Sequence, residues 1–461
     1  MTVTPATAAL DHLDADLENA LDRLFQLLRI ESISTDPAYA GQCRQAAEWH
    51  AADLAGMGFD ARVAETPGHP IVVAHHDGPG PHVLFYGHYD VQPVDPLELW
   101  TRGGPFDPAV IEVGGHQVIH GRGAGDDKGQ LMTFVEACRA LKATTGALPC
   151  KVTILLEGEE ESGGSSLPGF LDAQRAELTA DIALITDTTM WDAETPAITT
   201  MLRGNLGEEV TVHAASRDLH SGMYGGAAAN PIHVLTRILS AMHDDQGRIT
   251  IPGFYDGVTE LPPAIKAQWE GLGFSAEKFL GDVGLSAPWG THGYTALEHV
   301  WARPTAEVNG IWGGYTGAGF KTVIPAEAHA KVSFRLVGTQ DPEDIRAKWR
   351  AFVQSQLPAD CRVSFEGRAG GTASVMPTDN PMFETARQAL TREWGREAAF
   401  IGSGGSIPVV GLLKDKLDMD AMLIGFGLED DNIHSPNEKY ALSSFHKGAR
   451  SWVRVLDAIG A

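Results

Sequence analysis

The chain has 461 residues, which is too long for one ordinary hydrophobic core and therefore predicts two domains. A hydrophobic content of 43% and a charged content of 21% are typical of a soluble globular protein. The formal net charge of -25 argues against nucleic acid and anionic membranes as partners, because an acidic surface repels both.

The cysteines and the start of the chain both favour a cytoplasmic location. The cysteines are dispersed without CxxC spacing, which is typical of free thiols in a reducing compartment. The first residues are acidic and amphipathic, and they lack the basic start and apolar core of a signal peptide. No apolar stretch approaches the length that a membrane-spanning helix needs, so we expect no membrane partner.

Helix and strand patterns in the first part of the chain predict an α/β fold. Leucines at helical spacing predict a helix over residues 10–30, and Gln45–Met57 has the same pattern. From about residue 70 to 187, apolar strand-like runs alternate with helices such as Leu131–Leu141. This order predicts βαβ units, and therefore a mostly parallel sheet with helices on both faces.

The pattern changes after Arg203. Short alternating segments surround an amphipathic helix at Pro231–Met242, and residues 243–300 are Gly/Pro-rich and irregular. Alternation with helices on one side predicts a small α+β layer that exposes one face of its sheet. The alternating segments are Glu209–His213, Ala328–Val337 and Arg362–Glu366. Helical periodicity then returns at Pro381–Trp394.

Candidate metal ligands each follow an apolar, strand-like run. In open α/β sheets, ligands bind in the crevice at the carboxyl ends of the strands, so these segments are expected to converge. Carboxylate and imidazole groups together are typical of a metal site with hydrolytic chemistry. The candidates are His88 and Asp90 after Val83–Tyr86, Asp126 after Gln117–His120, Glu160 and Glu161 after Val152–Leu156, Asp187 after Ile182–Ile185, and His434 after Ala421–Phe426.

Two of these segments suggest a role from local spacing. Asp90 lies two residues after His88, where its carboxylate can accept the second N–H of the imidazole and leave the other nitrogen for a metal. We interpret Asp90 as an orienting residue. Asp126 and Asp127 leave two interpretations open, an N-cap for the helix that follows and a bridge between metals. Both can hold, with one aspartate capping the helix and the other bridging.

The segment after Val152–Leu156 places four carboxylates in five positions, at Glu157, Glu159, Glu160 and Glu161. One interpretation is a solvated acidic turn. The other is a division of labour, in which one carboxylate binds metal and its neighbour handles the proton of a bound water. The preceding strand is apolar enough to be buried, where like charges are costly without a cation, and this favours the second interpretation.

Because His434 belongs with the earlier candidates, the chain must return to its first domain. We therefore predict a discontinuous catalytic domain made of residues 1–203 and 376–461, with an inserted domain at 204–375 between them.

Motifs along the chain resemble those of the M20 family of metallopeptidases, and most closely its carnosinase-like dipeptidase branch. They run in the family's order from about residue 10 to the C-terminus. The long DLHSGMYGG motif and the IPGFYDGV segment favour that branch. The motifs are GHYDVQP, GRGAGDDKG, EGEEESGG, LITD, RDLHSGMYGG, KTVIP, FRLVG, GGSIPV and IHSPNE.

The resemblance implies two divalent metal ions, zinc or else manganese or cobalt, that share Asp126 and a water. His88 and Asp187 would complete one ion's ligands, and Glu161 and His434 the other's. Glu160 would be the general base, with Asp90 behind His88, and the Asp126–Asp127 peptide is expected to be cis. The expected reaction is hydrolysis of the peptide bond of dipeptides by an exopeptidase. The alternative is an N-acyl- or N-carbamoyl-amino-acid amidohydrolase that uses the same site.

The resemblance also makes the inserted domain a lid and dimerisation domain. Substrate-binding positions would be His220, Thr322, Arg335 and Ser406, and Arg335 could pair with the terminal carboxylate of a peptide. A homodimer is expected, in which His220 reaches the partner's active site. The assignment of Glu160 as base counts back from Ser162-Gly163, and it leaves Glu159 either solvated or perturbing the base.

Overall fold

The computed structural model describes residues 5–461, and these residues form two compact units. Unit 1 contains the chain up to Thr200 together with Met376–Ile401 and Leu412–Ala461. Unit 2 contains Met201–Val375 and Gly402–Gly411. The short segment Gly402–Gly411 thus groups with unit 2, although the chain on both sides of it belongs to unit 1.

Unit 1 is built on a mixed sheet with the strand order β1-β2-β6-β3-β7-β17-β8. The central pairs β6-β3, β3-β7 and β7-β17 are parallel, and the outer pairs β1-β2, β2-β6 and β17-β8 are antiparallel. The α/β prediction is confirmed, with parallel pairing at the centre of the sheet. The strands are β1 (Asp60–Ala64), β2 (Ile71–His76), β3 (His82–His88), β6 (Lys151–Glu157), β7 (Ile182–Ile185), β17 (Ala421–Leu423) and β8 (Ala197–Leu202), and β16 (Ala399–Ser403) pairs with β8.

The central strands are short apolar runs whose side chains are buried, and their parallel register aligns their carboxyl ends. All residues of β7 are buried, and those of β3 are buried from Val83 onward. The register pairs His88 at the end of β3 with Glu157 at the end of β6. The polar residues that follow these strands therefore emerge along one edge, which is where open α/β sheets bind ligands.

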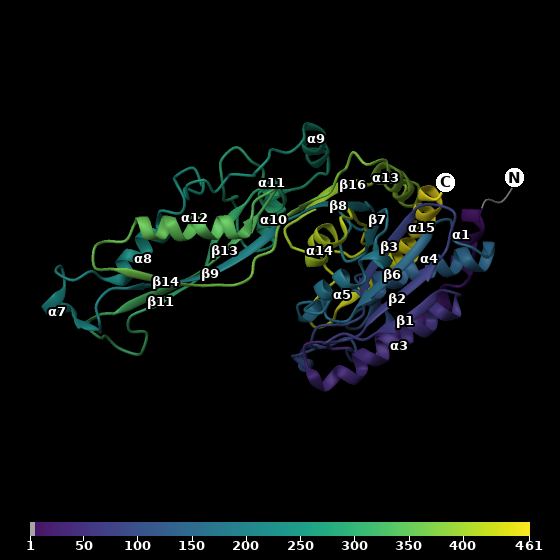
Figure 1. Ribbon diagram of the computed structural model, residues 1–461, viewed down its shortest axis with the longest axis horizontal. Helices are drawn as coiled ribbons and strands as arrows, with labels where there is room; N and C mark the ends of the chain where they lie inside the picture. Colours follow the sequence, from purple (N-terminus) through teal and green to yellow (C-terminus); the bar gives the residue numbers. More distant parts are fainter. Residues whose placement is uncertain (1–4) are drawn as a thin grey trace. The chain divides into compact units, whose positions relative to one another are not determined.

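Helices of unit 1 pack together and onto this sheet (Figure 1). Helix α15 packs against both α4 and α13, while α3 packs against β1 and β2. Aromatic rings fill the space between α4, α15 and β3, where Phe85 stacks on Phe134 and both meet Trp452 edge-on. The helices are α1 (Pro5–Ala15), α2 (Leu17–Leu28), η1 (Pro37–Tyr39), α3 (Ala40–Gly56), η2 (Leu97–Leu99), α4 (Lys128–Thr145), η3 (Glu160–Ser162), α5 (Leu167–Ala173), α6 (Arg175–Leu178), α13 (Pro381–Trp394) and α15 (Leu442–Ile459), and α14 (Pro408–Leu417) begins in the segment that groups with unit 2.

Three expectations about unit 1 are wrong in detail. The strand before Asp126 lies outside the main sheet, because β5 (His116–His120) pairs with β4 (Ala109–Val113) and β18 (Lys439–Ala441) in a small antiparallel sheet. The apolar run at 421–426 forms a strand only as far as Leu423. At Gly425 the chain passes so close to the carbonyl oxygens of Thr186 and Thr188 that a Cβ would overlap them. The predicted helix over 10–30 is divided between α1 and α2.

Unit 2 is an antiparallel sheet in the order β11-β13-β9-β14, with helices α8 and α12 packed on β9 and β13. Side chains of β13 alternate between buried positions and exposed or part-exposed ones, as expected for a sheet with one covered face. The buried side includes Val332, Phe334 and Trp349. The elements are β9 (Gly204–His213), β10 (Leu219–His220), α7 (Ser221–Tyr224), α8 (Pro231–Ser240), β11 (Thr305–Gly313), β12 (Val323–Ile324), β13 (Glu327–Leu336), α12 (Pro342–Ser355) and β14 (Arg362–Gly367). The short strand β15 (Ser374–Val375) instead pairs with β8 at the end of the large sheet.

The Gly/Pro-rich region 243–300 contains short helices joined by loops, which agrees with its irregular sequence. They are α9 (Pro263–Gly271), α10 (Ala276–Gly281) and α11 (Ala296–Trp301). Across residues 5–461, no helix combines the length and the apolar character that crossing a membrane requires.

Candidate active site

His88 is held in one orientation at the end of β3. Its side chain is fully buried, and its Nδ1 lies 3.1 Å from the carbonyl oxygen of Asp90 and 3.4 Å from the Asp90 carboxylate. These contacts leave Nε2 to face Asp126, whose Oδ1 is 3.0 Å away. The sequence had suggested the Asp90 carboxylate as the partner of Nδ1, and the structure adds the main-chain carbonyl of the same residue at shorter range.

Asp126 lies between two imidazoles. Its Oδ2 is 2.9 Å from Nε2 of His434, while its Oδ1 faces His88. His434 Nε2 is also 3.2 Å from Glu161 Oε1. The peptide bond between Asp126 and Asp127 is cis, as expected. One carboxylate thus has an oxygen directed to each of two histidines that come from distant parts of the chain.

These side chains form two donor groups among residues 5–461 that could each hold a metal ion. One group is His88, Asp126 and Asp187, and the other is Asp126, Glu161 and His434. Within each group the candidate ligand atoms all lie within 4.8 Å of one another. Each group offers one imidazole and two carboxylates, with Asp126 common to both. Such mixed nitrogen and oxygen donors fit zinc, manganese or cobalt.

The charges of these groups favour a cation. Burial, followed by the charge of Asp126, raises the pKa of Asp187 to about 8. The carboxylates of Asp126 and Glu161 raise the pKa of His434 to about 10. Burial alone would lower the pKa of His88, but its contact with Asp126 raises that pKa well above the usual value. Desolvated carboxylates crowded around two imidazoles lack the positive charge that metal ions would bring.

The four carboxylates at 157–161 have four different environments. Glu157 is buried and accepts a hydrogen bond from the Tyr86 hydroxyl at 2.5 Å. Glu159 is also buried, and its two oxygens accept the backbone N–H groups of His69 (3.3 Å) and Ser166 (2.9 Å). The interpretation of this segment as a solvated turn is therefore wrong for both residues.

Glu160 and Glu161 face the donor groups instead. Glu161 belongs to one of them, and its Oε2 accepts a hydrogen bond from Gln92 at 2.8 Å. Burial is the largest influence on Glu160, and it raises the pKa of that carboxyl. Among the described residues, no hydrogen-bond donor or ion-pair partner of the Glu160 carboxylate is found. That carboxylate is therefore free to bind a water or a substrate.

Asp127 does not act as the expected helix cap. It occupies the N-cap position of α4, but its side chain makes no capping hydrogen bond. One of its oxygens instead accepts the backbone N–H of His88 at 3.2 Å. This contact requires a glycine before His88, since a Cβ at Gly87 would lie 2.9 Å from the same Asp127 oxygen. Asp127 thus helps to fix the strand end that carries His88.

The loop with His434 is held by residues that sequence reasoning missed. Glu438 is fully buried, and its Oε1 accepts the backbone N–H groups of Gly125 at 2.9 Å and Asp126 at 3.2 Å. Its Oε2 accepts a hydrogen bond from Arg122 Nη1 at 2.6 Å. The signal for Glu438 was its place in the IHSPNE motif, but Arg122 lies 316 residues away from it in sequence.

The predicted substrate-binding residues all belong to unit 2, where they form two pairs. His220 and Thr322 are neighbours, because β10 pairs with β12 and the N–H of Ser221 donates to the Thr322 carbonyl at 3.0 Å. Both side chains are exposed. Arg335 and Ser406 form the other pair, with Nη1 of the arginine 3.3 Å from the serine hydroxyl.

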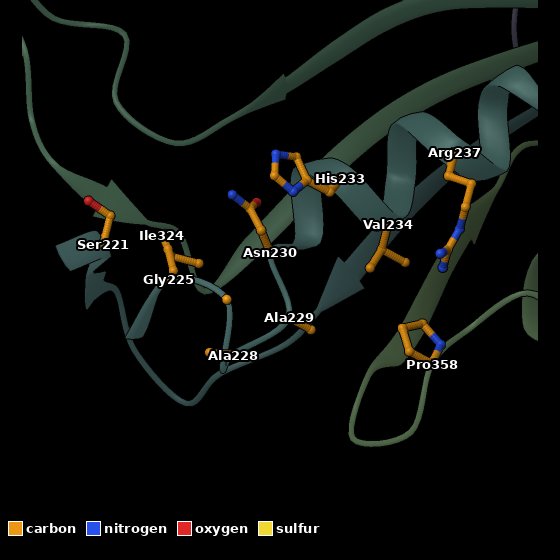
Figure 2. A pocket seen from close by; sticks show the side chains of 11 residues that line it. Ser221, Gly225, Ala228, Ala229, Asn230, His233, Val234, Arg237, Ile324 and Pro358 are labelled. Atoms are coloured by element: carbon orange, nitrogen blue, oxygen red, sulfur yellow. The ribbon is translucent and has the colours of Figure 1, made fainter. Parts of the chain in front are cut away.

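A pocket of 560 Å³ lies beside α7 and α8 in unit 2. Figure 2 shows that its polar side chains His233 and Arg237 come from α8, beside small residues such as Ala228 and Ala229. The residues that line it include neither metal-donor groups nor the predicted substrate-binding residues. We assign no function to this pocket.

Imidazole and carboxylate donors gathered in two groups that share Asp126 are typical of a metal-dependent hydrolase. The chain belongs to the peptidase family M20/M25/M40, whose model matches residues 84–458. The family implies divalent metal ions.

The relatives confirm the resemblance to the dipeptidase branch. The Cys-Gly metallodipeptidase dug1 of Schizosaccharomyces pombe is 30% identical, over 95% of this chain and 95% of the relative. The Beta-Ala-His dipeptidase of Rattus norvegicus is 29% identical, over 85% of this chain and 80% of the relative. The structure of the dipeptidase Dug1p from Saccharomyces cerevisiae has a TM-score of 0.78 and 28% identity, covering 100% of this chain and 99% of that one.

Proposed function

We propose that the chain is a dipeptidase that binds two divalent metal ions, one in each donor group. The observation that carries the proposal is the position of Asp126, whose two carboxylate oxygens face His88 at 3.0 Å and His434 at 2.9 Å. A carboxylate shared in this way suits a pair of ions better than a single one. His88 and Asp187 would complete one site, and Glu161 and His434 the other.

The ions, when bound, would acidify a shared water and polarise the carbonyl of the scissile peptide. Glu160 would act as general base, taking the proton of the attacking water and delivering it to the leaving amine. The raised pKa of Glu160 and the absence of a protein partner for its carboxylate among the described residues support this role. Asp90 would keep His88 in the orientation that presents Nε2.

The unit 2 residues would bind the substrate. Arg335 and Ser406 form a polar pair suited to the terminal carboxylate of a dipeptide, and recognition of that carboxylate would make the enzyme an exopeptidase. His220 would donate a hydrogen bond to the oxyanion of the tetrahedral intermediate, and Thr322 nearby would contact the substrate. We further propose a homodimer in which His220 serves the partner's active site, zinc as the metal and a cytoplasmic location.

The relatives support dipeptides as the substrate class. Those with identities near 30% are named for the hydrolysis of Cys-Gly and of Beta-Ala-His. Structures of amidases of the hydantoinase/carbamoylase family share 14% identity or less with this chain, which shows a common fold alone. The alternative of an N-acyl- or N-carbamoyl-amino-acid amidohydrolase therefore has no specific observation in its favour.

The test is hydrolysis of a free dipeptide beside its N-acetylated counterpart, each with and without a chelator. We expect cleavage of the free dipeptide, loss of that cleavage with chelator, and recovery on adding zinc or manganese. Preference for the acetylated compound would move the protein to the amidohydrolase alternative. Cleavage that survives exhaustive chelation would overturn the metal-dependent mechanism.

A further inference from the structure

Arg203 lies next to the pair formed by Arg335 and Ser406 in unit 2. Its backbone carbonyl accepts a hydrogen bond from the Ser406 hydroxyl at 2.8 Å, and the same hydroxyl lies 3.3 Å from Arg335 Nη1. Arg335 is also the cross-strand partner of Asn205, two residues after Arg203. Arg203 directly precedes β9, and the side-chain amide of Asn205 lies 3.4 Å from the same Ser406 hydroxyl, so Arg203, Asn205 and Arg335 all approach Ser406.

The guanidinium of Arg203 is fixed by neutral groups. Its Nε donates to the carbonyl of Gly404 at 3.2 Å, and its Nη1 donates to the carbonyl of His299 at 3.3 Å. A guanidinium carries five N–H donors, and these bonds use two of them. The remaining donors of Arg203, and most of those of Arg335, have no protein acceptor among the described residues.

Neither arginine has an acidic partner. Within residues 5–461, no carboxylate lies within 4.0 Å of either guanidinium. Glu307 on β11, the strand that pairs with the strand of Arg335, influences Arg203 only from a greater distance. Two other arginines of unit 2, Arg346 and Arg350, are by contrast neutralised by Glu208. Burial and then the charge of Arg335 lower the pKa of Arg203 to about 10. Two unneutralised guanidiniums that are close enough for their charges to interact, in a chain with a net charge of -25, leave an uncompensated positive charge that an anion would offset.

We propose that Arg203 is a specificity-determining residue that binds the substrate's terminal carboxylate together with Arg335. This inference rests on the proposed function, because a dipeptide supplies the carboxylate. A substrate whose carboxyl terminus is neutral should therefore bind less well, because it would leave two part-buried arginines without a counter-ion. Arg203 would thus set the preference for a free acid over an amide.

The competing explanation is that Arg203 only supports the fold, by tying Gly404 and the end of α11 to β9. The two explanations differ in their effect on a substrate without a carboxylate. A structural residue affects every substrate alike, whereas a carboxylate-binding residue affects only those that carry the carboxylate. The free dipeptide and its C-terminal amide therefore separate them.

The experiment measures kcat and KM for a dipeptide and for its amide with the metal-loaded protein. The variants are Arg203→Met, which removes the charge, and Arg203→Lys, which keeps it but loses the planar fork. Lys331→Met serves as the control, because it removes a positive charge from an exposed position on β13, the strand of Arg335. Thermal melting of each variant reports on folding independently of turnover.

We expect Arg203→Met to raise KM for the free acid about tenfold to hundredfold, the range for hydrogen bonds to charged groups. The expected kcat is little changed, because the contact is made equally in the ground state and the transition state. KM for the amide should not rise, and Arg203→Lys should retain part of the wild-type preference.

Equal losses on the acid and the amide would overturn the proposal and assign Arg203 to the fold. The proposal would also fail if Lys331→Met raised KM for the acid as much as Arg203→Met. A wild-type protein that hydrolyses neither compound would instead overturn the proposed function. Failure of the role of Arg203 and failure of the dipeptidase assignment are thereby distinguished.

Discussion

Replacing Glu438 tests whether the active-site loops are held together by a buried carboxylate. The oxygens of Glu438 accept the backbone N–H groups of Gly125 and Asp126 and a hydrogen bond from Arg122. Its own carbonyl accepts the N–H of Gly121 at 3.1 Å. Because His434 is four residues earlier in the same loop, Glu438 joins the segments that carry two of the metal donors.

The expected loss can be worked out contact by contact. Glu438→Gln keeps an acceptor for the backbone N–H groups but leaves the buried Arg122 without its counter-ion, which costs about 3–5 kcal/mol of unfolding free energy. Glu438→Ala also strips the N–H groups of Gly125 and Asp126, at about 1–3 kcal/mol each if water does not replace the acceptor. Outer residues that orient metal ligands typically contribute about 10- to 100-fold in metal affinity, and we expect a loss in that range.

The assay pairs urea unfolding of the chelated protein with calorimetric titration of manganese into the folded protein. Glu136→Gln is a matched control, because Glu136 is also buried in unit 1 and paired with arginines, Arg23 at 2.6 Å and Arg139 at 3.2 Å. Both glutamine variants should lose stability, but only Glu438→Gln should lose metal affinity. Equal manganese affinities in the two variants would refute the positioning role and leave Glu438 as a contributor to stability alone.

Two further predictions concern pH and the base. Burial lowers the pKa of His50 to about 3, so between pH 6.5 and 3 the unfolded chain takes up a proton that the folded protein refuses. The free energy of unfolding should therefore decrease as the pH is lowered, by about 2 kcal/mol from this residue between pH 6.5 and 5. When the chelated protein is unfolded with urea, the His50→Phe variant should show a smaller dependence of stability on pH than the wild type. Glu160→Gln should lose about 10²- to 10⁴-fold in kcat with metal content retained, as is usual for a general base. Glu159→Gln should stay far more active, because Glu159 accepts two backbone N–H groups, and an equal loss would move the base assignment to Glu159.

Elements with a strong local signal could be predicted from the sequence with their bounds. Ile182–Ile185 and Pro381–Trp394 have the predicted limits, the first because all its side chains are buried and the second because Asn380 caps it and Gly395 ends it. A strand signal does not identify the strand's neighbours, so β5 was placed in the wrong sheet. The early end of β17 depends on a close approach at Gly425 to a distant loop, which local hydrophobicity does not report.

The candidate metal donors could be predicted from the sequence, but most of the residues that orient them could not. The candidate metal donors follow strand-like runs, and this context, together with the motif match, singled out His88 and His434, which the structure brings into the two donor groups. The residues that orient the donors were harder to find. The side chain of Asp127 accepts the N–H of His88 and does not cap its own helix. The sequence pattern at the start of a helix does not predict such a contact with a residue elsewhere in the chain. Likewise, no local pattern links Glu438 to Arg122 across 316 positions.

The architecture of unit 1 explains why one aspartate can face two histidines. Strand β17 pairs with β7, whose end leads to Asp187, and β18 pairs with β5, which leads to Asp126. His434 lies in the loop between β17 and β18. This loop begins at the strand beside β7, which leads to Asp187, and it ends at the strand beside β5, which leads to Asp126. The chain leaves unit 1 at Thr200 and returns at Met376, whose N–H donates to the Thr200 carbonyl at 2.9 Å. Exit and return are thus adjacent, and all the metal donors come from unit 1. The inserted unit can therefore vary in sequence without changing any residue of the two donor groups.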